Sequence, residues 1–244
     1  PMGSQTNAPL PDGLEVGGYR ILRKIASGGF SIVYLAEDSD GNRYAIKEYL
    51  PSNLVRRNEG ELSPAVAGEN ASTYRNGLKC FFEEGRALAK INHPNVVRVL
   101  NFFRANETVY MVMRYERGRT LQQQIQMRQD QMSERLVRHV FMHLLNGLRE
   151  VHTHKLLHLD IKPRNLVVDG SGRVRVIDLG ITSLLAGDLS AGQPMTVSMV
   201  TPYASPEQVR GEAVSPATDV YTLGVVLYEL LTGHHPHQHA AGDQ

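Results

Sequence analysis

A short polar run, from His158 to Asn165, carries side chains that can position a hydroxyl group and a metal ion. It holds the carboxylate of Asp160, the ammonium of Lys162 and an amide, and a second carboxylate, Asp178, follows after a predicted hairpin. Mg²⁺ prefers hard oxygen ligands and shares them with substrate phosphates. Either segment alone is an ordinary polar turn. Both together, bridged by a strand pair, predict a site for Mg²⁺ and a substrate hydroxyl.

Two further features could bind phosphate, although neither is specific alone. Gly28 and Gly29 lie between two predicted strands, where backbone amides can approach an anion because no Cβ is in the way. Most such pairs are simple hairpin turns. Lys47 ends an apolar strand and Glu84 lies on a predicted helix, and each could equally be a solvated surface residue. Spacing does not establish that Lys47 and Glu84 pair.

The elements that must position these residues form a sheet-rich first part and a helix-rich second part. In the second part Ser133 is a suitable N-cap for a helix, and residues 219–231 are apolar nearly all round, which is typical of a buried helix. Ligand sites favour junctions between unlike lobes. The expected strands are 19–25, 32–36, 44–46, 96–103, 108–113, 166–168 and 174–177, and the expected helices include 78–88, 133–151 and 219–231.

Composition excludes several classes of protein. The 244 residues are 41% hydrophobic and 21% charged, which excludes a wholly disordered chain. No apolar run reaches the ~18 residues of a membrane span. A net charge of +1 gives no reason to expect nucleic acid or an anionic membrane as partner. A single cysteine, Cys80, excludes a disulfide within the chain and fits a reducing compartment, so we expect a cytoplasmic domain.

Taken in order, the motifs strongly resemble those of the protein kinase family, over residues 19 to about 236. Lys162, two residues after Asp160, has the Ser/Thr-kinase form, and the sequence after Lys47 looks bacterial. The motifs that carry the resemblance are the glycine turn, Ala45-Ile46-Lys47, Glu84, the run 158–165, Asp178-Leu179-Gly180 and Ser205-Pro206-Glu207.

The resemblance implies an α+β, two-lobed kinase fold. Residues 1–18 would be a flexible tail. Residues 19–114 would form a small antiparallel-sheet N-lobe with one main helix and an insertion near 51–72, and residues 115–244 a mainly helical C-lobe. The chain ends soon after 219–231, where the family adds several helices. We therefore expect a truncated C-lobe that lacks its last helices and self-associates through an uncovered apolar face.

The resemblance also implies the roles of the site residues. Asp160 would orient the substrate hydroxyl and accept its proton, Lys162 would steady the γ-phosphate, and Asn165 and Asp178 would hold Mg²⁺. Glu84 would hold Lys47 against the α- and β-phosphates of ATP. The remaining residues expected to bind ATP are Ala26, Ser27, Gly28, Gly29, Phe30, Val33, Ala45, Met113, Arg114, Glu116 and Val167.

The sequence departs from the family pattern at several places. Ala26 and Ser31 stand where the first and third glycines of the loop are common, and Leu159 replaces the arginine before the catalytic aspartate. Without that arginine, phosphorylation of the activation loop is not expected to be a strict switch. The long insertion is either solvated or a docking element that sets the angle of the Glu84 helix. Candidate phosphosites in the activation loop are Thr182, Ser183, Ser190, Thr196 and Ser198.

Three functions remain open from the sequence. The first is an active Ser/Thr protein kinase that uses Mg-ATP and acts on protein substrates. The second is a nucleotide-binding pseudokinase or regulatory module with little transfer activity, which the altered glycine loop and the short C-terminus favour. The third is a kinase of small molecules, against which the long activation loop and Ser205-Pro206-Glu207 argue.

Overall fold

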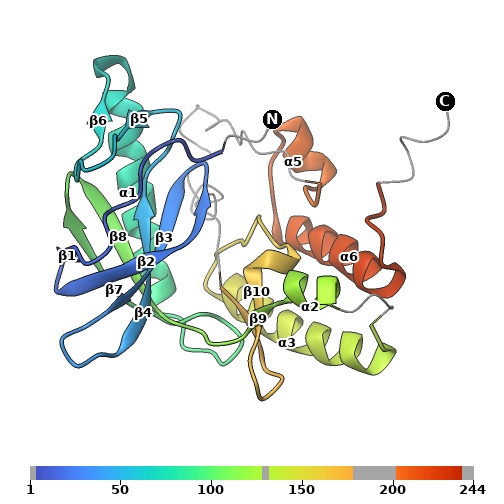
Figure 1. Ribbon diagram of the computed structural model, residues 1–244. Helices are drawn as coiled ribbons and strands as arrows, with labels where there is room; N and C mark the ends of the chain where they lie inside the picture. The colour runs from blue at the N-terminus through green and yellow to red at the C-terminus, as the bar shows by residue number, and fades with distance from the viewer. Residues whose placement is uncertain (1–3, 128–131, 178–201, 238–244) are drawn as a thin grey trace. The chain divides into compact units, whose positions relative to one another are not determined.

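The computed structural model describes residues 4–127, 132–177 and 202–237. The chain forms two compact units (Figure 1). Unit 1 comprises residues up to 90 together with 98–115, and unit 2 comprises residues 91–97 and everything from 116 onward. Residues 91–97 group with unit 2 because the Asn95 side chain donates to the Val174 carbonyl at 2.9 Å and the Val97 amide donates to Val176 at 2.8 Å. A sheet-rich unit and a mainly helical unit agree with the α+β kinase fold expected from the sequence.

Six antiparallel strands form the main sheet of unit 1, in the order β1-β2-β3-β4-β8-β7. Short turns join β1 to β2, β2 to β3, β3 to β4 and β7 to β8, whereas β4 and β8 pair although they are distant in the chain. The turn between β7 and β8 needs positive φ at Asn106 (48°) and Glu107 (55°), as hairpin turns of this type require. The strands are β1 (Glu15–Val16), β2 (Tyr19–Gly28), β3 (Ser31–Glu37), β4 (Arg43–Tyr49), β7 (Val99–Ala105) and β8 (Thr108–Arg114).

One long helix, α1 (Ala71–Ala89), packs against this sheet in unit 1. A short 3-10 turn, η1 (Gly68–Asn70), leads into it. A Cβ at Gly77 would collide with the Tyr49 hydroxyl on β4, and a Cβ at Gly85 would lie 3.4 Å from the Met111 methyl on β8. Small residues at these two positions therefore let the helix approach the strands closely.

The N-terminal segment lies on the sheet of unit 1, which differs from the flexible tail expected for residues 1–18. Leu10 is 1% exposed, and its amide donates to the Tyr34 hydroxyl at 2.9 Å. The Ala8 amide donates to the Arg57 carbonyl at 3.0 Å, and β1 pairs with β2. The sequence missed this because a single apolar residue among polar ones shows no periodicity.

The insertion after β4 is partly buried, which differs from the solvated segment considered above. It contains a small hairpin of β5 (Val55–Arg56) and β6 (Ala65–Val66). Arg57 forms a bidentate ion pair with Glu48, with Nη2 2.7 Å from Oε1 and Nη1 2.8 Å from Oε2, and both side chains are fully buried. Tyr34 (3.0 Å) and Tyr110 (2.7 Å) donate to the same carboxylate. The insertion is therefore attached to β4 beside Lys47.

Unit 2 combines helices with one small sheet, in the order β11-β10-β9. The Ser133 side chain accepts a hydrogen bond from the Leu136 amide at 3.4 Å, as predicted for the N-cap of α3. The elements are β9 (Arg119–Thr120), α2 (Leu121–Met127), α3 (Glu134–Thr153), η2 (Pro163–Asn165), β10 (Leu166–Val168), β11 (Val174–Val176), α5 (Pro206–Arg210) and α6 (Pro216–Thr232).

The apolar helix α6 packs against α3 and is buried on one side only. Leu223 and Val226 are buried, whereas Val220, Tyr228 and Leu231 are 59%, 43% and 43% exposed. The prediction of a helix buried all round is therefore wrong, and the expectation that part of it is uncovered agrees with the structure. None of the helices in residues 4–127, 132–177 and 202–237 has the length and hydrophobicity needed to cross a membrane.

Candidate active site

Three predicted site residues meet in unit 2, directly before β10. The Lys162 ammonium lies 3.0 Å from the Asp160 carboxylate. The Asn165 amide nitrogen donates to the Asp160 carbonyl at 2.8 Å and to its carboxylate at 3.2 Å. The Asp160 and Lys162 side chains are 30% and 19% exposed, so a hydroxyl group from solvent or from a substrate can reach them. The loop thus gathers a base, a cation and an amide within hydrogen-bonding distance.

The backbone that carries Asp160 is strained, and distant elements hold it in place. Leu159 has φ of +60°, which costs a non-glycine residue about 1–2 kcal/mol. Its amide donates to Asp219 at 2.8 Å and its carbonyl accepts from Gln208 at 3.0 Å. The Asp160 amide donates to the His158 Nδ1 atom at 3.1 Å. Contacts from α5 and α6 therefore set the direction in which Asp160 leaves the loop.

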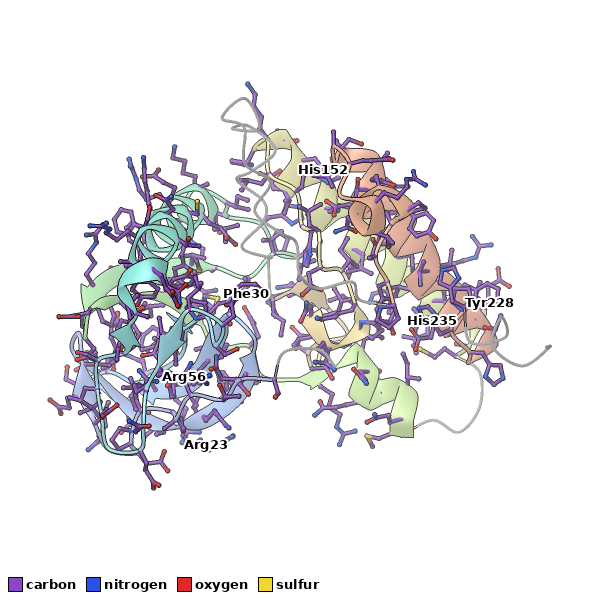
Figure 2. The ribbon with its side chains drawn as sticks, turned by 90° about the horizontal axis from the view of Figure 1, so that it is seen from above. Arg23, Phe30, Arg56, His152, Tyr228 and His235 are labelled. Carbon is purple, nitrogen blue, oxygen red and sulfur yellow. The ribbon has the colours of Figure 1, made fainter. Side chains whose placement is uncertain are left out.

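Asp219, on the first turn of α6, is the centre of this support. It is fully buried and accepts hydrogen bonds from the His158 amide (2.9 Å), the Leu159 amide (2.8 Å) and the His152 ring (2.7 Å), and Figure 2 shows His152 on α3. Burial raises the pKa of Asp219, but these hydrogen bonds and the attraction of His158 outweigh it, so the pKa lies below its usual value. The carboxylate stays ionised and keeps accepting.

The sequence marked Asp219 as the start of an apolar helix whose Asp-x-Tyr-x-x-Gly pattern resembles the kinase family, but it did not predict a supporting role for Asp219, His152 or Gln208. A buried carboxylate must find donors, so an acid inside an apolar helix is a signal that could have been used. No local signal marks His152 or Gln208. Their contacts join residues 67 and 49 positions apart in the chain.

In unit 1, four predicted ATP-binding residues share one face of the sheet. In the strand register Val33 lies opposite Lys47, and Ala45 lies opposite Met113. Side chains two residues apart on a strand point to the same face, so Ala45 and Lys47 lie together. The three strands therefore present apolar side chains beside one lysine. Arg114 is the last residue of β8.

Lys47 and Glu84 are both buried, with 6% and 1% of their surface exposed. Tyr49, two residues after Lys47, packs against α1, which carries Glu84. Met111, opposite Lys47 in the register, approaches α1 at Gly85, the next residue after Glu84. Buried charges are almost always paired. This placement supports the pairing of Lys47 with Glu84, which remains a prediction.

The glycine turn joins β2 and β3 in unit 1. Ala26, Ser27 and Gly28 end β2, and Phe30 precedes β3 (Figure 2). A Cβ at Gly28 would have no heavy atom within 4 Å, so the turn is open there. This openness is compatible with a phosphate group close to the backbone.

Two predicted adenine contacts belong to unit 2. Val167 is the middle residue of β10 and is 6% exposed. The Glu116 carboxylate lies 3.0 Å from Arg175, which is also 3.0 Å from Asp169 at the end of the β10 strand. These ion pairs connect the residue at the start of unit 2 to the β10–β11 hairpin.

The remaining predicted site residues lie outside the residues that the structure describes. These are the predicted metal ligand Asp178 and the candidate phosphosites Thr182, Ser183, Ser190, Thr196 and Ser198.

The chemistry at Asn165 suits a hard divalent cation. Its side-chain nitrogen donates to Asp160, which leaves the side-chain oxygen as the atom that could bind a cation. Mg²⁺ prefers such oxygen ligands together with a carboxylate. In the described part of the chain no three His, Cys, Asp or Glu side chains gather as a metal site. The second predicted ligand, Asp178, lies outside the described residues.

Comparisons with known proteins agree with these observations. The family model of the protein kinase domain matches residues 19–244. A probable serine/threonine-protein kinase PknB of Lactococcus lactis is 32% identical over 219 residues, which cover 89% of this chain and 32% of that protein. The serine/threonine-protein kinase PrkC of Bacillus subtilis is 30% identical, over 90% of this chain and 31% of that protein. The chain thus spans about a third of the length of these relatives.

Solved structures show the same fold. The structure described as the PpkA-294 apo form has a TM-score of 0.74 and 32% sequence identity, and the match covers 93% of this chain and 80% of that chain. A structure of Rad53 in complex with AMP-PNP has a TM-score of 0.67 at 23% identity, covering 90% of this chain and 49% of that chain, which supports the fold alone. With the family model spanning most of its length, the chain belongs to the protein kinase family.

Proposed function

We propose that this domain transfers the γ-phosphate of ATP to serine and threonine hydroxyls of proteins. The observation that carries the proposal is the cluster of Asp160, Lys162 and Asn165 in an accessible loop. Buried Asp219 holds this loop by accepting a hydrogen bond from the Leu159 amide. Membership of the protein kinase family supports it, as do relatives named serine/threonine-protein kinases.

In the proposed reaction, Asp160 accepts a hydrogen bond from the substrate hydroxyl and aims its oxygen at the γ-phosphorus. As the new O–P bond forms and the bond to the ADP oxygen breaks, the hydroxyl proton passes to the Asp160 carboxylate. Lys162, 3.0 Å from Asp160, contacts the γ-phosphate and offsets its negative charge. Phosphoryl transfer depends mostly on positioning and charge stabilisation, and these side chains supply both.

Unit 1 would supply the ATP contacts. Lys47, held by Glu84, would bind the α- and β-phosphates, and the amides of the glycine turn would cover them. Mg²⁺ would neutralise phosphate charge when bound, with Asn165 and Asp178 as its protein ligands. Adenine and the hinge would be contacted by Val33, Ala45, Met113, Arg114, Glu116 and Val167.

The proposal extends to partners and location. Protein substrates follow from the proposed activity, and the activation-loop hydroxyls are candidates for autophosphorylation. The exposed side chains of α6, among them Val220 and Tyr228, support self-association through that face. Use of ATP and a chain with a single cysteine support a cytoplasmic location for this domain.

The test is a transfer assay with labelled ATP, Mg²⁺ and a generic basic protein. Asp160→Asn keeps the size of the side chain but removes the base, and we expect transfer to fall by at least about 100-fold. Glu134→Gln is the matched control, because this carboxylate is on unit 2 and 72% exposed. It should transfer phosphate at the wild-type rate.

The outcomes separate the possible functions. Nucleotide binding without transfer by the wild-type chain would contradict the proposal and favour a regulatory module. Transfer to a small molecule but to no protein would contradict the protein substrate. Equal transfer by Asp160→Asn and wild type would remove Asp160 from its proposed role.

A further inference from the structure

Three successive carbonyls of the glycine turn accept hydrogen bonds from residues outside the β2–β3 hairpin. The Gly28 carbonyl accepts from the Gln5 side chain at 3.0 Å. The Gly29 carbonyl accepts from the Ser52 amide at 2.8 Å, and the Phe30 carbonyl accepts from the Leu50 amide at 2.7 Å. Leu50 and Ser52 thus continue the pairing of β4 with β3 beyond the end of β4. Gln5 supplies the donor for the third carbonyl, that of Gly28. Each of these three carbonyls of the glycine turn is therefore hydrogen-bonded to a residue outside the hairpin.

The Gln5 side chain uses both ends of its amide in this contact. Its nitrogen donates to the carbonyls of Gly28 and of Leu50, the second at 2.8 Å. Its oxygen accepts from the amide and the side chain of Asn7, at 3.1 and 3.0 Å. Because both donors and the acceptor are engaged, the side chain has one defined orientation. Gln5 therefore connects the turn directly to the strand end that follows Lys47.

The segment that carries Gln5 is itself anchored. Asn7 is 6% exposed and accepts from the Arg57 amide at 2.7 Å, while Arg57 Nε donates to the Ala8 carbonyl at 2.9 Å. Arg57 in turn pairs with buried Glu48. The chain that follows Gln5 is consequently fixed by hydrogen bonds to the buried Arg57. Gln5 can therefore restrict the motion of the turn to which it is bonded.

We propose that Gln5 is a positioning residue for the glycine turn, fixing the amides that face the phosphates of ATP. In a trans peptide the N–H points opposite to the preceding C=O. Fixing the carbonyls of Gly28, Gly29 and Phe30 therefore fixes the amides of the residue that follows each of them. A preorganised set of amides binds phosphate more tightly than a mobile one, because less ordering is needed on binding. This inference rests on the proposed function of unit 1 in binding ATP.

The direct test uses Gln5→Glu, which keeps the length and the acceptor toward Asn7 but removes both donors. We expect MgADP to bind about 2- to 10-fold more weakly by calorimetry. The KM for ATP should rise with little change in kcat, as for lost uniform binding. The amides of Leu50 and Ser52 should exchange hydrogen faster, which reports the turn leaving its support. Gln5→Met, which removes the donors without adding charge, should show the same weaker MgADP binding and the same faster exchange as Gln5→Glu.

Thr6→Ala is the matched control. The Thr6 hydroxyl, next to Gln5 on the same segment, accepts from Arg56 at 3.2 Å rather than bonding to the turn, so nucleotide binding and hydrogen exchange at Leu50 and Ser52 should be unchanged. Wild-type values for both Gln5 variants would overturn the proposal, as would equal effects of Thr6→Ala. A wild-type chain that binds MgADP but transfers no phosphate would contradict the proposed function alone and leave this comparison intact.

Discussion

Glu48 in unit 1 and Asp219 in unit 2 are buried carboxylates that adjoin predicted site residues, but their hydrogen-bonding partners differ in kind. In unit 1 Glu48, which follows Lys47, is paired with the guanidinium of Arg57 and accepts hydrogen bonds from two tyrosine hydroxyls. In unit 2 Asp219 accepts mainly from backbone amides, including that of Leu159, and from the His152 ring. Both are fully buried, so each depends completely on its partners.

The difference shows two ways to rigidify a site. The Glu48–Arg57 pair joins whole segments, since Arg57 also binds the N-terminal segment through Asn7 and Ala8. Burial alone would lower the pKa of Arg57, but hydrogen bonding and attraction to Glu48 raise it above its usual value. Asp219 instead holds one strained peptide, before Asp160. The Glu48–Arg57 pair thus attaches two segments to the sheet, whereas Asp219 fixes the backbone conformation of Leu159.

The largest effect should come from breaking the ion pair. Arg57→Met leaves the buried carboxyl group of Glu48 without its cation, and we expect the free energy of unfolding to fall by about 3–5 kcal/mol in a urea titration. Adding Glu48→Gln removes the stranded charge and should restore at least about 1 kcal/mol. A loss below about 1 kcal/mol for Arg57→Met would mean that the pair does not hold the insertion.

A smaller effect is expected at Asp219. Asp219→Asn keeps the shape but loses the charge, and its amide group opposes a backbone N–H, so stability should fall by about 2–3 kcal/mol. Phosphate transfer should fall as well, because Leu159 is no longer held at positive φ. Glu134→Gln serves again as the control: transfer should be unchanged, and stability should fall by less than about 0.5 kcal/mol because only an exposed ion pair with Arg138 is lost. Full transfer activity in Asp219→Asn would contradict the role of this carboxylate in directing Asp160.

The smallest and most specific effect is the pH dependence of the contribution that Asp219 makes to the free energy of unfolding. Since its folded-state pKa is lowered, its contribution to stability is complete above the ordinary aspartate pKa of about 3.9. It is lost as pH falls through the lowered pKa. The difference in unfolding free energy between wild type and Asp219→Asn should therefore narrow as the pH falls below about 4. A difference that stays constant or widens would show that the pKa is not lowered.

The sequence predicted local elements well, because their signals are local. The apolar stripe of residues 137–151 and the cap at Ser133 predicted α3, and turn residues between apolar segments predicted the strands that carry Val33, Ala45 and Met113. Of the site, the spacing from Asp160 to Asn165 predicted a cluster that the structure brings together. The short α5 and the strands β5, β6 and β9 were missed, since elements this short show no periodicity.

The sequence did not predict correctly which segments are buried where tertiary packing decides their exposure. The segment from Gln5 to Leu10 has the composition of a tail, yet its amides and one leucine complete the packing around Arg57 and Tyr34. The helix at 216–232 reads as apolar all round, yet one side of it is exposed. A polar sequence can be buried when distant donors satisfy it, and an apolar one can be exposed when nothing covers it.

By itself the sequence determined the family, the order of the motifs and the positions of the proposed catalytic groups, because these depend on residue identity and short spacing. The tertiary structure decided which groups hold them. Glu48 with Arg57, Asp219 with Leu159 and Gln5 with Gly28 join segments by contacts that follow no local pattern. The physical reason is that a buried charge or a backbone carbonyl outside the strand pairing is stabilised by whichever donor the folded chain brings within about 3 Å. That choice is made only when the chain folds.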